Sequence, residues 1–260
     1  MIEGVTVRQA GEGDAVRGVT PRWVALPETV EEIAAVLRAC AERDLAVVPA
    51  GGGTKLHWGP PPERCDVLLD LCCMNEILEH AAGDLVVRAQ AGVTMDALAG
   101  TLADKGQELA LDVPFTEDTT VGGTLAAALP GPRSFRYGTA RDLLIGITVV
   151  LPDGTIARSG GKVVKNVAGY DLGKLFTGSY GTLGVIAEAT FRLHPLPPTA
   201  AGSSPGWSAP RWPRWRRRWR PRRPSRAPSR WTGRIRTGRS RWRRWWRARR
   251  PRPGPRRCAS

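Results

Sequence analysis

The 260-residue sequence lacks the features that would assign it to several common classes of protein. It has no apolar run of about 18 residues or more, so no membrane-spanning helix is predicted. Residues 1–18 show no basic region followed by an apolar stretch, so a secretory signal is not expected. The five cysteines include one adjacent pair and no C-x-x-C, which argues against a disulfide framework or a zinc site and favours reduced thiols in a cytoplasm.

Two familiar phosphate-binding motifs are also absent. No G-x-G-x-x-G follows the first predicted strand, and G-x-x-x-x-G-K-[ST] does not occur in the sequence. The glycines of such motifs let the backbone approach a pyrophosphate or cradle a nucleotide's phosphates. The sequence therefore supports neither a Rossmann dinucleotide site nor a Walker loop.

Lysine, aspartate and glutamate are missing from the last 60 residues. Residues 201–260 hold 22 Arg, 9 Pro and 8 Trp, whereas residues 1–200 hold 17 basic and 24 acidic groups, a net charge of −7. The overall charge of +15 therefore averages a mildly acidic body and a strongly basic tail. Because the tail has almost no aliphatic side chains, it cannot build a packed core.

Three interpretations of this tail compete. Arginine with interleaved tryptophan can bind nucleic acid by phosphate pairing and base stacking. The same chemistry can bind an anionic membrane surface. The third interpretation is a frameshift, because the composition is that of GC-rich codons translated out of frame. The abrupt loss of Lys, Asp, Glu, Val and Leu at one point favours the frameshift.

The body of the chain shows alternating strand and helix patterns. Residues 23–26 form a predicted strand, and Thr29, with Glu32 three residues on, predicts a capped helix. The strands predicted at 45–48 and 67–71 complete a small α/β lobe. The apolar face expected for the helix consists of Val30, Ile33, Val36, Leu37, Cys40 and Ala41.

A second lobe is predicted from about residue 82. It contains a strand at 85–89, a helix capped by Thr94, a hairpin from 144 to 157 and a strand at 183–193. The face expected for the helix is Met95, Leu98 and Leu102. The chain is thus expected to be α+β, with an N-terminal extension (1–20), a two-lobed body (21–81 and 82–197) and a low-complexity tail (198–260).

Four glycine-rich segments carry the candidate chemistry. In the first, 49–56, consecutive glycines after a strand can aim backbone N–H groups at a pyrophosphate, or form a plain flexible turn. In the second, 119–127, the glycines open an Ala-rich helix, where either a ligand or a tightly packed neighbour requires small residues. The third, 136–142, contains Arg141 and Asp142, which either order a loop or face solvent. The fourth runs from 160 to 195.

In this order and spacing, PAGGGTKL, TVGGTLAA, YGTARDLLIGITVVLPDG and residues 160–195 resemble the FAD-binding domain of the vanillyl-alcohol oxidase type, also called PCMH-type. The string KVVKNVAGYDLGKLFTGSYGTLGVI is similar to the FAD-binding subunits of glycolate oxidases. D-lactate dehydrogenases and alkyl-dihydroxyacetone-phosphate synthases share parts of it. The resemblance covers about residues 21–197 and implies a PCMH-type FAD-binding domain of two α/β lobes.

The resemblance also implies which residues contact FAD. Relatives that bind flavin covalently carry His where Gly53 stands, so non-covalent FAD is implied, and His57 is expected to be a surface or packing residue. The first segment is expected to wrap the pyrophosphate through Ala50, Gly51, Gly52, Gly53, Thr54, Lys55 and Leu56. A second pyrophosphate and ribose contact is expected from Thr120, Val121, Gly122 and Gly123, with Thr119 beside them. The adenine and ribose contact is expected from Gly181, Gly184, Val185 and Ile186.

The remaining candidates have two interpretations each. Arg141 and Asp142 lie near the flavin in relatives, or they support their loop. Lys165, Asn166 and Tyr170 belong to a loop that either closes over the flavin or packs, and Asp171 is expected to cap the helix that follows. None of the matched segments identifies a catalytic base, and no metal site is predicted.

The activity implied is the removal of a hydride equivalent from a 2-hydroxy acid such as glycolate to FAD. A larger flavin subunit and an iron–sulfur subunit are the implied partners, and no specific nucleic acid is expected. A cap domain follows the strand end at 192–195 in relatives, but here the tail stands in its place, so the chain is expected to lack half of the active site. The alternatives are a nucleic-acid-binding protein and a non-catalytic flavoprotein assembly subunit. The implied location is cytoplasmic, or peripheral at the inner membrane through the partners.

Overall fold

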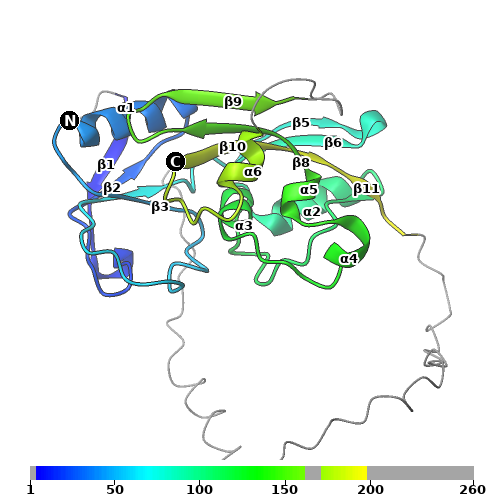
Figure 1. Ribbon diagram of the computed structural model, residues 1–260, viewed down its shortest axis with the longest axis horizontal. Helices are drawn as coiled ribbons and strands as arrows, with labels where there is room; N and C mark the ends of the chain where they lie inside the picture. The colour runs from blue at the N-terminus through cyan, green and yellow to red at the C-terminus, as the bar shows by residue number, and fades with distance from the viewer. Residues whose placement is uncertain (1–3, 162–170, 198–260) are drawn as a thin grey trace, which may run out of the picture. The chain divides into compact units, whose positions relative to one another are not determined.

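Two β-sheets and their covering helices make up residues 4–161 and 171–197, the part of the chain that the computed structural model describes (Figure 1). A hydrophobic cluster joins the two sheets, because Ile33 and Leu37 of the first helix pack with Val150 and Ala187 of the larger sheet. The α+β class expected from the sequence is confirmed.

The first sheet has four strands in the order β1-β2-β4-β3. Strands β2, β4 and β3 are parallel, and β1 adds to β2 in the antiparallel direction. Because β1 lies within residues 1–20, the expected extension is in fact part of this sheet. The strands are β1 (Thr6–Gln9), β2 (Trp23–Leu26), β3 (Val47–Ala50) and β4 (Val67–Asp70).

Helix α1 (Val30–Ala41) connects β2 to β3. Thr29 caps it as predicted, since its Oγ1 accepts a hydrogen bond from the Glu32 amide at 3.2 Å. The Glu32 carboxylate accepts from the amide of Glu28, at 2.7 Å, one residue before the position that a capping box requires. The predicted apolar face is buried except for Ala41, the exposed last residue of the helix, and it also includes Ala34, which the prediction missed.

Strand β3 begins two residues later than predicted. The amide of Leu45 donates to the Cys40 carbonyl at 2.9 Å, and the amide of Ala46 donates to the Asp66 carboxylate at 2.8 Å. These bonds hold residues 45 and 46 in the turn that leaves α1, so the strand starts only at Val47.

The second sheet is antiparallel, with five strands in the order β5-β6-β10-β8-β9. The predicted hairpin and the last predicted strand are confirmed. Strand β5 was not predicted, and because it pairs with β6, the second sheet begins before residue 82. The strands are β5 (Ile77–Ala81), β6 (Val86–Gln90), β8 (Leu144–Val150), β9 (Ile156–Gly160) and β10 (Val185–Arg192).

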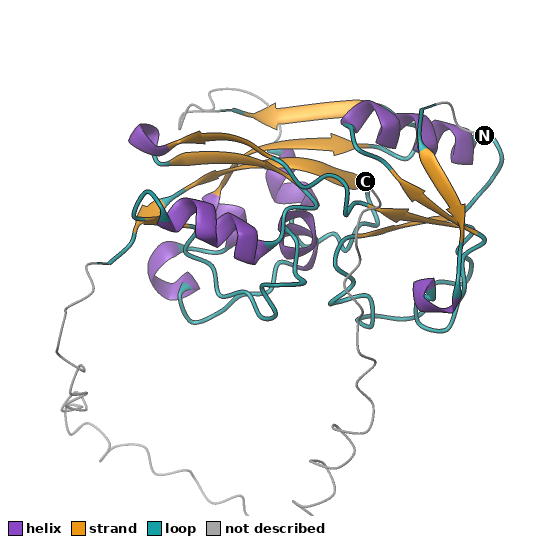
Figure 2. Cartoon of the chain, turned by 180° about the vertical axis from the view of Figure 1, so that it is seen from behind, coloured by secondary structure: helices purple, strands orange, loops and turns teal. Residues whose placement is uncertain are grey.

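Helices cover both faces of this sheet. Several short helices lie together on one face, as Figure 2 shows, and α1 packs against β8 and β10 from the other. Thr94 caps α2, and the predicted face of Met95, Leu98 and Leu102 is buried. The helices of the first face are α2 (Met95–Ala103), α3 (Val121–Ala127), α4 (Ser134–Tyr137), α5 (Ala140–Leu143) and α6 (Leu172–Phe176).

The remaining elements are small. Strands β7 (Gln107–Glu108) and β11 (His194–Pro195) pair with each other, and the 3-10 helices η1 (Glu12–Asp14) and η2 (Ala82–Asp84) lie in connections. Within the described ranges, no helix has both the length and the hydropathy needed to cross a membrane.

Candidate functional site

Two of the predicted glycine-rich segments meet at the carboxyl end of β3. The loop after β3 presses against the residues that precede α3, and a Cβ on Gly52 would lie 1.5 Å from the Asp118 carbonyl oxygen. A Cβ on Gly51 would lie 2.3 Å from Thr120 Oγ1. Only glycine permits so close an approach, so the glycines that the sequence singled out hold the two segments together.

A cluster of polar side chains lies where the two segments touch. The Lys55 ammonium donates to Thr54 Oγ1 at 3.1 Å and to Thr119 Oγ1 at 3.3 Å, and the two hydroxyl oxygens are 3.2 Å apart. Thr119 is buried, and its hydroxyl donates to the Pro114 carbonyl at 2.9 Å. Residues 64 or 65 positions apart in the sequence therefore form one polar centre.

The charge of Lys55 has no counter-charge in the described ranges. Burial lowers the pKa of the Lys55 ammonium, and no carboxylate of residues 4–161 or 171–197 forms an ion pair with it. A half-buried cation held by hydroxyl groups alone is costly unless an anion neutralises it. The cluster is therefore suited to an anionic ligand such as a pyrophosphate.

The segment before β10 joins the same place. A Cβ on Gly181 would lie 2.8 Å from Pro49 Cγ, and the rings of Trp58 and Tyr180 have centroids 6.5 Å apart. The hydroxyl of Ser179 is buried and has no hydrogen-bond partner among the described residues. Ser179 was not predicted as a site residue, although it lies in the matched string TGSYGTLG, where a hydroxyl between glycines was the available signal.

Two residues predicted to contact adenine lie in the strand itself. Val185 and Ile186 begin β10, their side chains are buried in the core, and they pair with Val150 and Val149. Gly184 precedes them, and a Cβ there would lie 2.6 Å from the Val150 carbonyl oxygen. The structure thus gives these three residues a packing role, and their contact with adenine stays a prediction.

The start of α3 is used by the fold itself. The amide of Val121 donates to the Val93 carbonyl and that of Gly122 to the Ala91 carbonyl, both at 2.8 Å. The amide of Gly123 donates to Thr120 Oγ1 at 3.2 Å. Of the two interpretations of this segment, tight packing accounts for Gly122, and its ligand contact stays a prediction.

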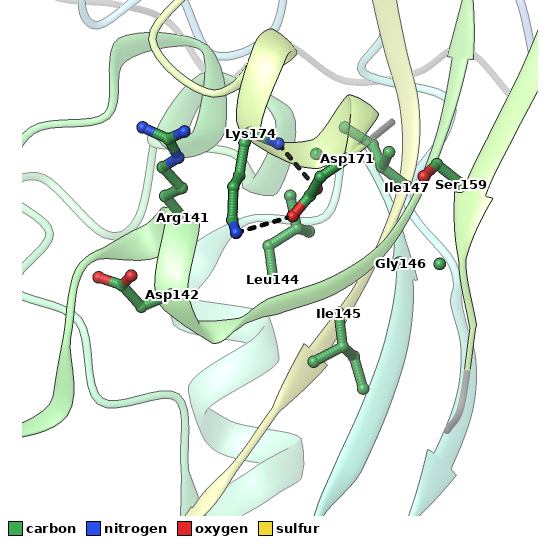
Figure 3. A pocket seen from close by; sticks show the side chains of 11 residues that line it. Arg141, Asp142, Leu144, Ile145, Gly146, Ile147, Ser159, Asp171 and Lys174 are labelled. Atoms are coloured by element: carbon green, nitrogen blue, oxygen red, sulfur yellow. Dashed lines mark hydrogen bonds and ion pairs between the residues drawn. The ribbon is translucent and has the colours of Figure 1, made fainter. Parts of the chain in front are cut away.

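Arg141 and Asp142 lie at a different place. The Asp142 carboxylate accepts from the Thr139 amide at 2.8 Å and from its hydroxyl at 2.7 Å, and these bonds lower the pKa of Asp142. Both residues line a pocket of about 240 Å³ that Leu144, Ile145 and Lys174 also line (Figure 3). None of the other predicted cofactor-binding residues lines this pocket.

The last candidates divide between described and undescribed positions. Asp171 caps α6 as predicted, since its carboxylate accepts from the Lys174 amide at 3.1 Å. His57 is exposed, in agreement with its expected surface role. Lys165, Asn166 and Tyr170 lie outside the described residues.

Comparison with known proteins assigns the family. A family model described as an FAD binding domain matches residues 21–160. The glycolate oxidase subunit GlcD of Bacillus subtilis is 38% identical over 186 residues, which are 69% of this chain and 40% of that protein. The mitochondrial D-lactate dehydrogenase [cytochrome] 1 of Saccharomyces cerevisiae is 37% identical over 180 residues, 68% of this chain and 30% of that protein.

Another relative and a solved structure agree. The mitochondrial D-2-hydroxyglutarate dehydrogenase of Bos taurus is 38% identical over 173 residues, 66% of this chain and 32% of that protein. A structure of alkyldihydroxyacetonephosphate synthase aligns with a TM-score of 0.60 and 28% identity, over 69% of this chain and 33% of that one. The chain thus spans only 30–40% of the length of these three curated relatives. The family model and the curated relatives agree with the glycine-rich segments that meet at β3. The chain therefore belongs to the family of PCMH-type FAD binding domains found in FAD-linked oxidoreductases.

Proposed function

We propose that this chain is the FAD-binding part of an oxidoreductase that removes a hydride equivalent from a 2-hydroxy acid such as glycolate. The observation that carries the proposal is the cluster around Lys55, a half-buried cation with hydroxyl partners and no carboxylate in the described ranges. A dinucleotide flavin brings the pyrophosphate that such a cluster requires.

The residues of the cluster fit the cofactor. Lys55, Thr54 and Thr119 would hold the pyrophosphate, and the buried hydroxyl of Ser179 would donate to another polar group of FAD. Bound FAD supplies the acceptor for the hydride equivalent. Gly53 stands where relatives that bind flavin covalently carry His, so the proposed binding is non-covalent.

The substrate class is proposed from the relatives. Glycolate, D-lactate and D-2-hydroxyglutarate, after which three relatives are named, all carry a hydroxyl on the carbon next to a carboxylate. This chain spans less than half of each of these relatives. The proposed partners are a larger flavin subunit and an iron–sulfur subunit, and the proposed location is the cytoplasm or the inner membrane surface through them.

The test starts with the full chain as purified. We expect a flavin absorption spectrum, and we expect acid precipitation of the protein to leave FAD in the supernatant. Anaerobic addition of glycolate, D-lactate or D-2-hydroxyglutarate, with and without partner subunits, should bleach the flavin band if the substrate class is right. A folded chain that takes up no FAD would contradict the proposal.

The outcome of the same experiment separates the alternatives. Flavin that binds but is bleached by no 2-hydroxy acid, even with partners present, would favour a non-catalytic assembly subunit. Binding of nucleic acid by the tail stays an untested alternative, because residues 198–260 lie outside the described ranges.

A further inference from the structure

Two adjacent cysteines occupy a turn next to the loop that leaves β3. Cys72 and Cys73 follow β4, and their Sγ atoms lie 3.7 Å apart. We propose that they form a vicinal dithiol that captures a trivalent arsenical, a thiophilic group whose single arsenic atom bridges two sulfurs. The capture of an arsenical by these thiols does not depend on the proposed function.

The spacing of the sulfurs suits one bridging atom better than a direct bond. Trivalent arsenic is pyramidal with bond angles of about 95°, so two sulfurs bound to it at about 2.3 Å, close to the usual zinc–sulfur length, stand about 3.4 Å apart. A disulfide needs about 2.05 Å between sulfurs and Cα atoms at least about 4.4 Å apart, whereas neighbouring Cα atoms are about 3.8 Å apart. The observed 3.7 Å therefore needs little change to hold a bridging atom and a large distortion to become a disulfide.

The turn brings the two thiols to one side and holds them there. The amide of Met74 donates to the Leu71 carbonyl at 3.0 Å, which closes a four-residue turn with the cysteines at its two central positions. The Cys72 amide donates to the Asp70 carboxylate at 3.1 Å. A dithiol fixed in this way loses little conformational freedom when it binds, and this favours capture.

Both ends of the turn are anchored to neighbouring segments. The amide of Leu71 donates to the Ala50 carbonyl at 2.9 Å, and the amide of Gly92 donates to the Met74 carbonyl at 2.8 Å. A Cβ on Gly92 would lie 2.0 Å from the Leu71 carbonyl oxygen, so a glycine is required for this contact. The dithiol therefore lies at the same sheet edge as the loop that leaves β3, on a support that does not need a ligand to form.

The other described cysteines differ in exposure. Cys40 and Cys65 are buried, and burial raises the pKa of both thiols, which disfavours the reactive thiolate. Cys72 and Cys73 are partly exposed and lie within reach of a reagent. Among the described cysteines, accessibility and pairing coincide only at this turn.

The capture step balances without an oxidant. An organic arsenous acid carries one carbon group and two hydroxyl groups on trivalent arsenic. Each cysteine sulfur forms a bond to arsenic, and each displaced hydroxide leaves as water with one thiol proton. Arsenic stays trivalent, the sulfurs are not oxidised, and the product is a ring that includes both cysteine side chains.

The experiment treats the full chain with phenylarsine oxide and measures intact mass and titratable thiols. We expect one phenylarsenic group per chain and the loss of two thiols, reversed by 1,2-ethanedithiol but not by an equal concentration of 2-mercaptoethanol. Cys72→Ser and Cys73→Ser should each weaken capture about 100-fold, because a second contact within one molecule multiplies affinity by roughly that factor. Cys258→Ser and Cys40→Ser should leave it unchanged.

Two results would overturn the proposal. One is an intact mass that, after exposure to the reagent, still equals that of the untreated parent chain. The other is capture that survives in Cys72→Ser or Cys73→Ser at the parent affinity, since another cysteine would then be responsible. Circular dichroism and flavin content of the serine variants separate loss of the site from loss of the fold.

Discussion

The two lysines Lys55 and Lys174 show how the same side chain serves two purposes. The Lys174 ammonium lies 3.1 Å from the carboxylate of Asp171, and both side chains are about half exposed. The Lys55 ammonium contacts only hydroxyl groups in the described ranges, and its pKa is lowered by burial. One charge is neutralised within the fold, and we propose that the other pairs with an anionic ligand. Among the described residues, the lack of a carboxylate partner, more than the presence of a lysine, distinguishes the proposed anion site.

The net charge of the whole chain is a poor guide to the proposed site. The 22 arginines of residues 201–260 dominate the total charge of +15, yet the family assignment rests on residues 21–160. The chemistry of the proposed site depends on one lysine, although residues 1–200 together carry a net charge of −7. Local charge balance is thus more informative here than the sum.

The largest expected effect comes from breaking the contact that builds the Lys55 site. Gly52→Ala would place a methyl group 1.5 Å from the Asp118 carbonyl oxygen, and forcing the segments apart should cost about 3 kcal/mol of stability. We expect loss of bound flavin and a lower Tm, measured by absorbance and thermal unfolding. Gly100→Ala is the matched control, because nothing lies within 4 Å of the added Cβ. Equal flavin content in the two variants would contradict the packing account.

The second prediction separates the two lysines directly. Lys55→Met should weaken FAD binding about 100-fold, the scale expected when a charge-assisted hydrogen bond is lost. Lys174→Met should leave the FAD affinity within about twofold, because Asp171 already neutralises Lys174. Titration of flavin-free full chain with FAD measures both values. A similar loss in both variants would remove the distinction between them.

As the pH rises, the stability of the flavin-free chain and its affinity for FAD should change in opposite directions. Because the pKa of Lys55 is lowered, the unfolded chain binds more protons than the flavin-free folded chain between the folded and unfolded pKa values. Stability without flavin should therefore rise with pH through that interval, as the buried charge is lost. FAD affinity should fall over the same interval, because the ammonium is the group proposed to pair with the pyrophosphate.

Thermal unfolding and FAD titration from neutral pH to about pH 10 measure the two trends. Lys55→Arg is the control, since an arginine stays charged throughout and should abolish both trends. FAD affinity that falls equally with pH in the arginine variant would assign the effect to another group.

The smallest expected effect concerns the pocket that contains Lys174. Asp142→Asn removes the carboxylate that holds the Thr139 amide and hydroxyl, at an expected cost of about 0.5 kcal/mol for an exposed cap. The pKa of Asp142 is lowered in the fold, so its contribution is present above the unfolded pKa and is lost as pH falls through the folded pKa. The Tm difference between parent and variant should shrink in acid, and FAD affinity should change by no more than about twofold. A large loss of flavin would favour the interpretation that Asp142 contacts the cofactor.

The elements that the sequence predicted are those with strong local signals. The helix after Thr29 and the hairpin at 144–157 have caps, turns and apolar periodicity within a few residues. Strand β5 has the sequence ILEHA, whose polar residues give a weak pattern, and it is defined by pairing with β6. Its strand state depends on that neighbour, so local analysis missed it.

The candidate site was predictable in its segments but not in its contacts. Consecutive glycines identified the loop after β3, and the resemblance supplied the other segments. The pairing of Lys55 with Thr119 joins residues 64 positions apart, and the orphan hydroxyl of Ser179 is visible only once the chain is folded. Likewise, only the folded structure shows that Arg141 and Asp142 line a pocket to which the Lys55 cluster does not contribute.

One measurement tests most directly whether Lys55 is the pyrophosphate-binding charge. Flavin-free parent and Lys55→Met are each titrated with FAD and with riboflavin, which lacks the pyrophosphate. We expect the substitution to weaken FAD binding about 100-fold and riboflavin binding by about twofold or less, so that the preference for FAD is largely lost. An equal loss for both ligands, or no loss for FAD, would contradict it.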